Sequence, residues 1–454
     1  MKKYSILINL LLLFFLFNDC QSQNLKTRIV VSNLDTPWEI LWGPDNYIWM
    51  TERPGKISRV NPETGEVKQL IKIDEVYENG ESGLMGLALH PNFQSTPYVY
   101  ASYSYRVNGN VKNKIVRYEY NNDNLQNPKV LIDGIDGSSI HNGSRLLFGL
   151  DGMLYATFGD ASNSSNAQDL NSLNGKILRM TDNGEIPSDN PIQNSYIWTY
   201  GHRNPQGLVF IGNQLFSSEH GSSTDDEINI IQKGRNYGWP DVKGFCDTQD
   251  EIAFCQEHNV VEPIKAWTPT IAPAGLDFYN NGQISDWDNS LLLVSLKGSR
   301  LTQLQLNQER NAILKEKQYF VNNYGRLRDI CISPDGRVFI ATSNRDGRGN
   351  PAQDDDKIIE VSEQGTGIKD GINDNSIQIH QNTSNPYLIE ISSIYSQMNI
   401  EIFDVLGKIY YSKNLFDSNQ FILDLSQVSS INNNHILFIR VYNKLTYRVS
   451  KILI

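Results

Sequence analysis

Short alternating runs of apolar and polar residues, separated by polar turns, recur along most of the chain. Three segments share one phrase, in which a turn containing Asp precedes an alternating strand with Thr near its end: GPDNYIWMTE from Gly43, GLDGMLYATF from Gly149 and SPDGRVFIAT from Ser333. Looser copies start at His90, Ile211 and Asp286, and most copies are followed by another strand after a loop. The pattern predicts six strand-rich units, about 45–70 residues apart.

The units show no helical periodicity of useful length between them. Antiparallel sheets of this size that repeat radially are the blades of a propeller. We therefore expect an all-β chain, with a six-bladed β-propeller over residues 25–362. A β-sandwich or two stacked barrels is the alternative architecture.

The repeat stops near Val361, and the chain changes character there. Residues 363–385 are rich in Gly, Asn and Asp, which is typical of a linker. Residues 386–454 contain short strands again, and the turn Leu406-Gly407 joins two of them as a hairpin. This length suffices for a small β-sandwich that is separate from the propeller.

Residues 1–23 are predicted to be an export signal. Lys2 and Lys3 precede the apolar run Ile6–Phe17, which is too short to span a bilayer. Cys20 is a candidate for lipid attachment, although the Asp before it fits that role poorly. We expect a secreted or cell-surface protein whose mature chain has no transmembrane segment.

Composition and charge narrow the class of protein further. The chain has 454 residues, 39% hydrophobic and 20% charged, which indicates a folded soluble protein of two or more domains. A net charge of −11 argues against nucleic acid or an anionic membrane surface as a partner.

The cysteines suit an oxidising compartment. Cys246 and Cys255 lie nine positions apart in one loop, so a disulfide is expected there. Cys331 lies in an apolar strand and is expected to be a buried thiol. No CxxC or HExxH spacing for zinc occurs in the sequence.

The stretch Tyr200–Pro240 concentrates polar groups in turns between apolar runs. Arg203, Asn204 and Gln206 crowd one turn, and Asp225, Asp226 and Glu227 follow a Gly-Ser-rich loop. Acidic oxygens beside backbone carbonyls freed by Gly221 are the ligands that calcium prefers. The alternative is a solvated loop with a capped strand.

Candidate chemistry also lies near strand ends in other units. His141 stands in a Gly/Asn/Ser turn before a strand, where a neutral imidazole can accept a proton from a substrate hydroxyl. Asp160 follows the same strand pair, and Lys297, Arg326 and Arg328 lie in later units. In a propeller these cations could converge at one end of the central channel and bind a polyanionic ligand. Taken singly, His141 would more often be a loop histidine, and each cation a scattered surface charge.

Residues 36–361 resemble the soluble PQQ-dependent aldose/glucose dehydrogenases, which are six-bladed propellers. The matching phrases, in chain order, are ESGLMGLALHPNF, HNGSRLLFGLDGMLYATFGD, GHRNPQG, SEHGSSTDDEIN, GRNYGWP, TIAPAGLDFY, SLKGSR and RLRDICISPDGRVF. Their number and order make the resemblance specific.

The resemblance implies roles for individual residues. His141 is implied to be the general base and Arg203 the cation beside the reacting carbonyl. The groups implied to hold the cofactor are Glu81, Asp160, Arg203, Asn204, Gln206, Lys297, Arg326 and Arg328. The carbonyls of Gly221 and Ser222 are implied to bind a calcium ion at the cofactor. Asp226, Glu227, Tyr237 and Asp247 resemble a second, structural calcium site.

Three positions depart from the family pattern. Ser222 stands where the family usually has proline, although its carbonyl remains available. Glu81 stands where some members have glutamine, and a carboxylate there would repel an anionic quinone unless it pairs with a cation. Trp267 is one position out of step, which puts the expected sugar-stacking platform in doubt.

The C-terminal segment resembles the sorting domain of the type IX secretion system. The resemblance rests on MNIEIFDVLGKIYYS and the final strand RVSKILI, whereas 432–439 lack the usual Gly-aromatic pair. It implies export through the type IX machinery, and an ordinary accessory β-domain is the alternative.

Together these features predict a secreted PQQ-dependent enzyme with calcium. It would oxidise the C1 hydroxyl of an aldose to a lactone and pass the electrons to an external acceptor. One alternative is a non-catalytic calcium-containing propeller that binds a glycan or a protein. A lactone-hydrolysing propeller is a second alternative, but it would need a carboxylate-rich centre rather than a ring of cations.

Overall fold

The computed structural model describes most of the chain, in two compact units that span 1–364 and 365–454. The described residues are 25–363, 377–381, 385, 387–393, 397–404, 409–416, 420–428, 436–442 and 447–453. The expected export signal, 1–23, lies outside them. No helix within the described residues is long and apolar enough to cross a bilayer.

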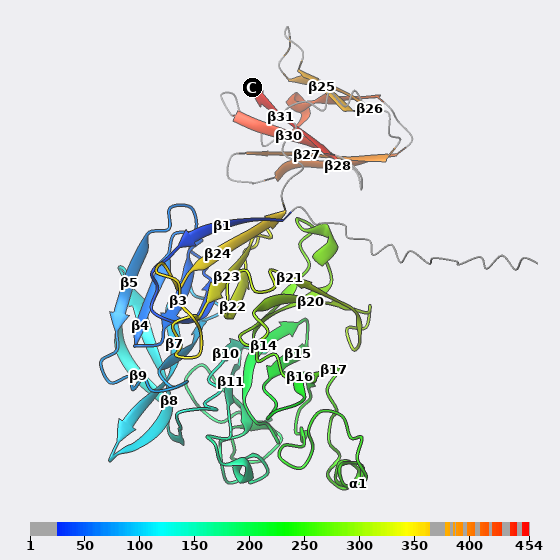
Figure 1. The fold of residues 1–454 in the computed structure, drawn as a ribbon. Coiled ribbons are helices and arrows are strands. Elements are labelled where there is room, and N and C mark those ends of the chain that lie inside the picture. The colour runs from blue at the N-terminus through cyan, green and yellow to red at the C-terminus, as the bar shows by residue number, and fades with distance from the viewer. Residues whose placement is uncertain are drawn as a thin grey trace, which may run out of the picture. The chain divides into compact units, whose positions relative to one another are not determined.

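Six four-stranded antiparallel sheets form the first unit (Figure 1), as the repeated phrases predict. The first sheet contains β2 (Pro37–Trp42), β3 (Ile48–Glu52), β4 (Lys56–Val60) and β5 (Val67–Lys72). The second contains β6 (Leu84–Leu89), β7 (Tyr98–Val107), β8 (Asn110–Asn121) and β9 (Asn124–Asp136). The third contains β10 (Leu146–Phe148), β11 (Leu154–Phe158), β12 (Lys176–Met180) and β13 (Ile197–Tyr200). The fourth contains β14 (Pro205–Ile211), β15 (Gln214–Glu219), β16 (Asp226–Ile231) and β17 (Lys265–Trp267). The fifth contains β18 (Pro273–Tyr279), β19 (Ser290–Ser295), β20 (Arg300–Leu306) and β21 (Ile313–Tyr319).

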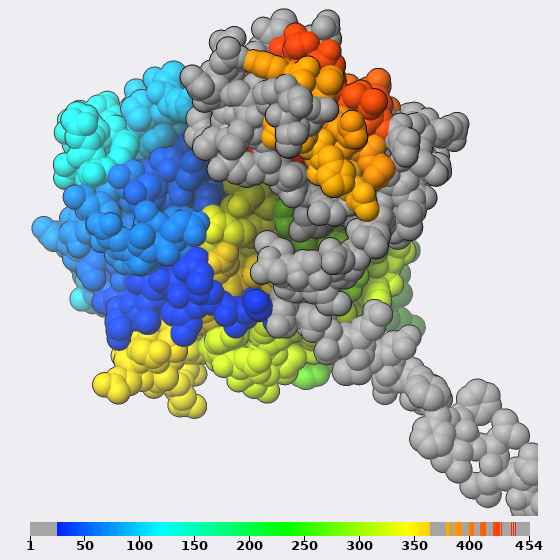
Figure 2. Space-filling view, turned by 90° about the horizontal axis from the view of Figure 1, so that it is seen from above, coloured from blue at the N-terminus to red at the C-terminus, as the bar shows by residue number. Residues whose placement is uncertain are grey.

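The sixth sheet closes the ring with a strand from the other end of the chain. It contains β22 (Leu327–Ile332), β23 (Val338–Thr342), β24 (Ile358–Glu363) and, as its outer strand, β1 (Leu25–Val31). β1 pairs antiparallel with β24, and in Figure 2 the N-terminal strands in blue lie against the yellow strands of the last sheet. The fold is therefore the six-bladed β-propeller that the repeat predicts.

Apolar side chains of neighbouring blades hold the ring together. Tyr100 and Ile115 of the second blade share one cluster with Leu154 and Phe158 of the third, and none of the four is exposed to solvent. Full burial of one side chain of this size stabilises a fold by about 1.5–3 kcal/mol. The strand ends are thus held on a rigid scaffold.

The innermost strand of most blades is irregular at its start. Within residues 25–363, the register shifts near the beginning of β2, β6, β14, β18 and β22. Such bulges leave a residue unpaired in the ladder and turn its side chain to a new direction. The second residue of each of these strands therefore has no partner in the strand ladder.

One helix interrupts the strands, and the alternation in the sequence does not predict it. Helix α1 (Gln249–His258) starts at Thr248, which forms a reciprocal capping box with Glu251. Short 3-10 turns occur at η1 (Ser164–Ala167), η2 (Ser285–Trp287) and η3 (Leu425–Gln427). None of the residues of α1 is buried, so packing contributes little to its position.

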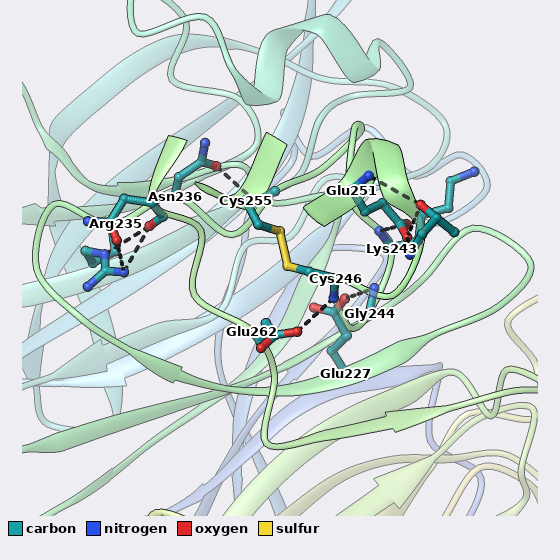
Figure 3. Close-up of a disulfide and its surroundings, with 12 residues drawn as sticks. Glu227, Arg235, Asn236, Lys243, Gly244, Cys246, Glu251, Cys255 and Glu262 are labelled. Atoms are coloured by element: carbon teal, nitrogen blue, oxygen red, sulfur yellow. Dashed lines mark hydrogen bonds between the residues drawn. A yellow bond between two sulfur atoms is a disulfide. The ribbon is translucent and has the colours of Figure 1, made fainter. Parts of the chain in front are cut away.

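A disulfide joins Cys255, within α1, to Cys246 in the loop before the helix (Figure 3), as expected from their spacing. Polar contacts tie the same loop to the propeller: the Gly244 amide donates to Glu227 at 2.9 Å and the Cys246 amide donates to Glu262 at 2.8 Å. Cys331 is a buried free thiol, also as expected.

Replacement of both bridge cysteines, Cys246→Ser with Cys255→Ser, is expected to lower the free energy of unfolding by about 2–3 kcal/mol. The reason is that the bridge restricts the loop in the unfolded chain. Denaturant unfolding of the two proteins, each with and without reductant, measures the effect. Reductant should destabilise only the wild type. If the two proteins are equally stable without reductant, the bridge does not contribute to the free energy of unfolding.

The second unit is a two-sheet sandwich, as predicted. One sheet contains β25 (Ile377–Gln381), β26 (Leu388–Ser393) and β29 (Gln420–Asp424). The other contains β28 (Ile409–Phe416), β27 (Gln397–Asp404), β30 (Ile436–Tyr442) and β31 (Tyr447–Leu453). Ile389 of the first sheet and Ile402 and Ile439 of the second are fully buried in one cluster.

The boundary of this unit differs from the one that the sequence predicts. β25 lies inside the segment 363–385 that was expected to be a linker, and Glu363 ends β24 of the propeller. A strand forms there because Ile377 and Ile379 alternate with polar residues opposite β26. The sandwich therefore starts before residue 386.

Candidate functional site

A cavity of about 420 Å³ lies at the end of the propeller where the inner strands begin. Trp38, Met85, Gln206 and Arg328 all line it, and each is the second residue of an inner strand, at the irregular register described above. Loops from the third and fifth blades complete the wall. All six blades thus contribute to one central cavity.

Most of the site residues predicted from the sequence meet in this cavity. Those that line it are Glu81, His141, Arg203, Gln206, Gly221, Ser222, Asp226, Lys297, Arg326 and Arg328. Asp160 and Asn204 are buried directly behind the wall. Glu227 and Tyr237 line a second cavity of about 20 Å³, and Asp247 is exposed and lines neither cavity.

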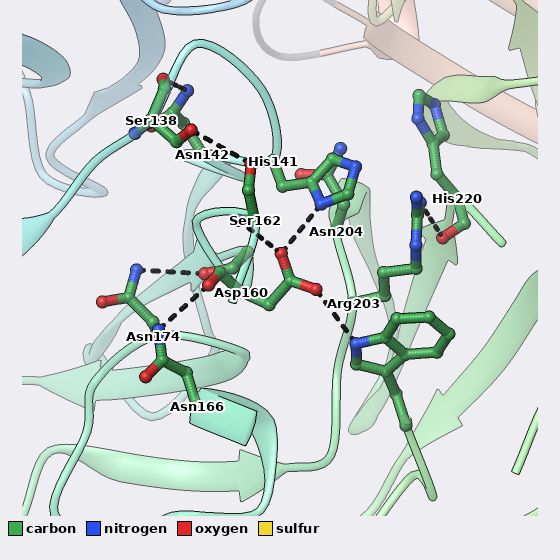
Figure 4. A network of polar contacts seen from close by, with 12 residues as sticks. Ser138, His141, Asn142, Asp160, Ser162, Asn166, Asn174, Arg203, Asn204 and His220 are labelled. Carbon is green, nitrogen blue, oxygen red and sulfur yellow. Dashed lines mark hydrogen bonds and ion pairs between the residues drawn. The ribbon is translucent and has the colours of Figure 1, made fainter. Parts of the chain in front are cut away.

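His141 is paired with a buried carboxylate (Figure 4). Its Nδ1 lies 2.8 Å from Oδ1 of Asp160, which also accepts a hydrogen bond from the Ser162 amide. His141 has a φ of 61°, and the loops around it are so close that a Cβ on Gly159 would lie 2.3 Å from its carbonyl oxygen. A carboxylate only accepts hydrogen bonds, so Nδ1 carries the proton and Nε2 is left with a lone pair.

Arg203 is held by its backbone and by a neighbouring carbonyl. The amides of Arg203 and Asn204 both donate to Glu219, and Nη1 of Arg203 donates to the His220 carbonyl at 3.1 Å. Burial lowers the pKa of Arg203, against the opposing effect of the nearby carboxylates. At neutral pH the guanidinium remains a cation that faces the cavity.

The six cations of the cavity wall fall into two groups. Three have carboxylate partners: Arg53 with Glu78 at 3.0 Å, Arg326 with Asp346 at 2.7 Å and Arg348 with Glu81 at 3.1 Å. Within the described residues, the other three have no carboxylate in salt-bridge contact. They are bound only to neutral groups: Arg203 to a carbonyl, Arg328 to Gln206 at 3.0 Å and Lys297 to Thr270 at 2.7 Å.

Several buried polar atoms around the cavity also lack a hydrogen-bond partner among the described residues. They are Nε of Arg203, Nε of Arg328, Nδ2 of Asn204 and Nε2 of His220. An unsatisfied buried donor is unfavourable and usually marks a group that binds a ligand, an ion or a water. Burial, with Arg328 and Arg203 nearby, lowers the pKa of His220 to about 3, so its ring is neutral.

Glu81 has the cationic partner that its position requires. One oxygen pairs with Arg348 and the other accepts the His141 amide at 3.1 Å. Burial would raise the pKa of Glu81, but His220, the His141 amide and Arg348 together lower it. The carboxylate is therefore charged and balanced, and it helps to hold the His141 loop.

The acidic loop near Gly221 is organised mainly by Asp226. This carboxylate accepts hydrogen bonds from the amides of Gly221 at 2.8 Å, Ile271 at 2.5 Å and Ala272 at 2.7 Å. Gly221 and Ser222 line both cavities. Among the described residues, no group of three or more His, Cys, Asp or Glu side chains is arranged to hold a metal ion.

A buried charge cluster lies below the cavity floor. Arg145 pairs with Glu39 at 2.7 Å and with Asp329 at 3.0 Å, and its Nε donates to the Gln206 carbonyl at 2.8 Å. Burial raises the pKa of Glu39 to about 8, with Asp329 adding to the shift and Arg145 opposing it. The cluster links three blades and supports the backbone of a residue in the cavity wall.

Sequence reasoning missed part of the wall. Trp38, Arg53, His220 and Arg348 line the cavity without having been singled out. His220 lies within SEHGSSTDDEIN and could have been found there. Trp38 reaches the cavity through a bulge, which no local sequence pattern predicts. Trp267 is buried, donates toward Glu316 and does not line the cavity, so it provides no platform for a sugar.

Comparison with known proteins agrees with the fold. Residues 34–350 match the family model described as Glucose / Sorbosone dehydrogenase. The chain is 33% identical to quinoprotein glucose dehydrogenase B of Acinetobacter calcoaceticus, over 76% of this chain and 91% of that protein. It is 30% identical to the aldose sugar dehydrogenase YliI of Escherichia coli (strain K12), over 71% of this chain and 91% of that protein.

A solved structure shows the same architecture. The PQQ-bound form of the aldose sugar dehydrogenase of Streptomyces coelicolor superimposes with a TM-score of 0.67 at 33% identity, over 75% of this chain and 98% of that one. The range that the family model matches contains every residue that lines the central cavity. The chain therefore belongs to the glucose/sorbosone dehydrogenase family.

Proposed function

We propose that this protein oxidises the C1 hydroxyl of an aldose to a lactone, with PQQ as cofactor and an external electron acceptor. The observation that carries the proposal is the His141–Asp160 pair at the edge of a cavity whose wall has three cations without carboxylate partners. The names of the similar proteins, which are sugar dehydrogenases, support the same reaction.

The cavity fits PQQ in charge. PQQ carries three carboxyl groups, and the wall contains six cations and three carboxylates, Glu81, Asp226 and Asp346. Lys297, Arg203 and Arg328 would hold the cofactor, because these three lack an acidic partner. The unsatisfied nitrogens of Arg203, Arg328 and Asn204 are donors ready for its oxygens. When bound, the quinone supplies the acceptor for the hydride that leaves C1.

His141 acts as the general base in this proposal. Asp160 keeps the proton on Nδ1, so Nε2 can take the proton from the C1 hydroxyl as the hydride departs. The buried carboxylate then stabilises the imidazolium that forms. Burial of Asp160, which is 2% exposed, keeps water from competing for this contact.

Arg203 stabilises charge at the reacting centre in this proposal. Its backbone is fixed by Glu219 and its guanidinium faces the cavity, so the cation needs little reorganisation when negative charge develops nearby. Burial of the guanidinium strengthens such an interaction relative to water.

We include calcium in the proposal because the available donor atoms are oxygens of the kind that calcium binds. The carbonyls of Gly221 and Ser222 are hard oxygen ligands at the cavity wall, in a turn that the Asp226 carboxylate stabilises. A cation there would act as a Lewis acid. Glu227 and Tyr237, around the second cavity, are the better candidates for a structural ion, whereas Asp247 lies apart from them.

Lys297→Met is expected to raise the Kd for PQQ about tenfold, because one unpaired, charge-assisted contact is lost. Absorbance titration of the purified protein with PQQ, in calcium, measures the affinity. Lys315→Met, which removes an exposed lysine from the outer strand of the same blade, is the matched control and should leave the Kd unchanged. Equal affinities in both variants would refute this placement of the cofactor.

The alternative of a non-catalytic propeller predicts a different result. A protein that only recognises a glycan has no need of a histidine fixed by a buried carboxylate beside unpaired cations. It would bind its ligand equally well after His141 is replaced. The cationic balance of the wall also disfavours a lactone-hydrolysing site.

We also propose that the chain is exported, with residues 1–23 as the signal and the C-terminal sandwich as a sorting domain for type IX secretion. The support is the sequence resemblance together with the separate compact unit 365–454. Deletion of residues 365–454 should leave the protein in the periplasm, and unchanged secretion of the shortened chain would contradict the assignment.

A further inference from the structure

Trp239 contacts both groups on which the proposed reaction depends. Its indole Nε1 donates to Oδ2 of Asp160 at 3.0 Å, while the other oxygen of this carboxylate holds His141. The guanidinium carbon of Arg203 lies 5.3 Å from the centre of the same indole ring. Figure 4 shows the contact between the Asp160 carboxylate and the His141 ring.

The backbone around Trp239 is fixed against the turn that carries Arg203. The Trp239 amide donates to the Gly201 carbonyl at 3.0 Å, and its own carbonyl accepts from Gln168 at 2.7 Å. A Cβ on Gly201 would lie 2.1 Å from Oδ1 of Asn236, so the two segments approach as closely as glycine permits. The indole is therefore placed by main-chain contacts on both sides.

The chemistry of indole suits this position. Its N–H is a donor that neither accepts a hydrogen bond nor ionises near neutral pH, so it occupies Oδ2 permanently and leaves Oδ1 for the imidazole. The ring face attracts a cation, which favours one position of the Arg203 side chain. Trp239 does not line the main cavity but lines the second one, and its contacts with Asp160 and Arg203 connect it to the proposed reaction.

We propose that Trp239 is a positioning residue that couples the base to the cation: its N–H orients Asp160 for His141, and its ring orients Arg203. This inference rests on the proposed function for its effect on turnover, but not for its effect on His141. The two contacts belong to different parts of one side chain and can be removed separately.

Trp239→Phe keeps an aromatic ring beside Arg203 and removes only the N–H. Asp160 then carries less stabilised negative charge and holds the protonated imidazole more tightly. The acid limb of the kcat/KM profile should move to higher pH by about half a unit. We expect kcat to fall about tenfold, with KM and the Kd for PQQ within about twofold of wild type.

Trp239→Leu removes the ring as well, so Arg203 also loses its support. Here kcat should fall about a hundredfold. The matched controls are Trp198→Phe and Trp198→Leu. Trp198, in the third blade, is half-buried like Trp239, but its ring faces Arg179 and Lys233, away from the cavity. These controls should keep the activity and pH profile of the wild type.

A measurement without cofactor or sugar separates this inference from the proposed function. NMR of the imidazole nitrogens of His141, in the full chain free of PQQ, reports the pH at which the ring protonates. In Trp239→Phe that pH should rise by about half a unit. An unchanged titration, or a pH profile and kcat equal to those of the wild type, would overturn the proposal. If even the wild type oxidises no aldose, the proposed function fails while this titration still decides the role of Trp239.

Discussion

His141→Ala is expected to lower kcat for aldose oxidation about a thousandfold while the protein still binds PQQ with an affinity near that of the wild type. In the proposed reaction the lone pair of Nε2 takes the proton from the C1 hydroxyl, and a methyl group cannot do so. The cations proposed to hold the cofactor are unaffected by the change. Stopped-flow reduction of the bound quinone by sugar, with a separate PQQ titration, measures the two effects independently.

Two further variants make this result specific. Asp160→Asn keeps the shape of the site but replaces an acceptor by a donor at Nδ1, so it should also lower kcat strongly. His220→Asn changes the other histidine of the cavity wall and should lower kcat less than tenfold, because that ring is neutral and its Nε2 has no hydrogen-bond partner among the described residues. Equal losses in His141→Ala and His220→Asn would show that His141 is not the base.

Arg145→Met is expected to lower the free energy of unfolding by about 3–5 kcal/mol at neutral pH. The change leaves the Asp329 carboxylate buried without its cation and Glu39 without its hydrogen-bond donor, and breaking a buried ion pair on one side is strongly destabilising. Arg28→Met is the control, because Arg28 pairs with Glu360 but is 44% exposed. It should lower stability by less than about 1 kcal/mol.

The pH dependence of stability tests the same cluster. The pKa of Glu39 is raised to about 8 in the folded protein, from an ordinary value of 4.5. Between these two values the folded state binds more protons than the unfolded state, so stability falls as the pH rises toward 9. Denaturant unfolding at pH 6 and pH 9 should show this fall in the wild type and a smaller one in Glu39→Gln, which mimics the protonated acid. An equal change in stability in the wild type and in Glu39→Gln would contradict the assignment.

The sequence predicts the propeller well because its signal is local and repeated. Each blade shows the turn and strand near GPDNYIWMTE or its copies, and strand alternation follows directly from burial on one face. Closure of the ring by β1 is a pairing between the two ends of the unit, and a local pattern does not contain it. Helix α1 was missed because it buries no residue and so has no apolar stripe.

The site could be predicted to a similar depth. His141, Arg203 and Lys297 stand in polar turns at strand ends, and a ring of blades brings such turns together. The partners of these residues depend on contacts between segments that are distant in the sequence. Glu81 is an example: the sequence alone does not identify its cationic partner, which is Arg348 of the last blade. Trp38 and Arg328 reach the cavity through bulges, which are set by register rather than by residue type.

The most direct test of the proposed reaction is dye-linked oxidation of a panel of aldoses by the purified protein in calcium, with and without PQQ. We predict oxidation at C1 of at least one aldose that appears only when PQQ is added and is lost in His141→Ala. The absence of PQQ binding at micromolar concentration, together with no oxidation of any sugar, would contradict the account. The central cavity would then have to be a recognition site for another anionic ligand.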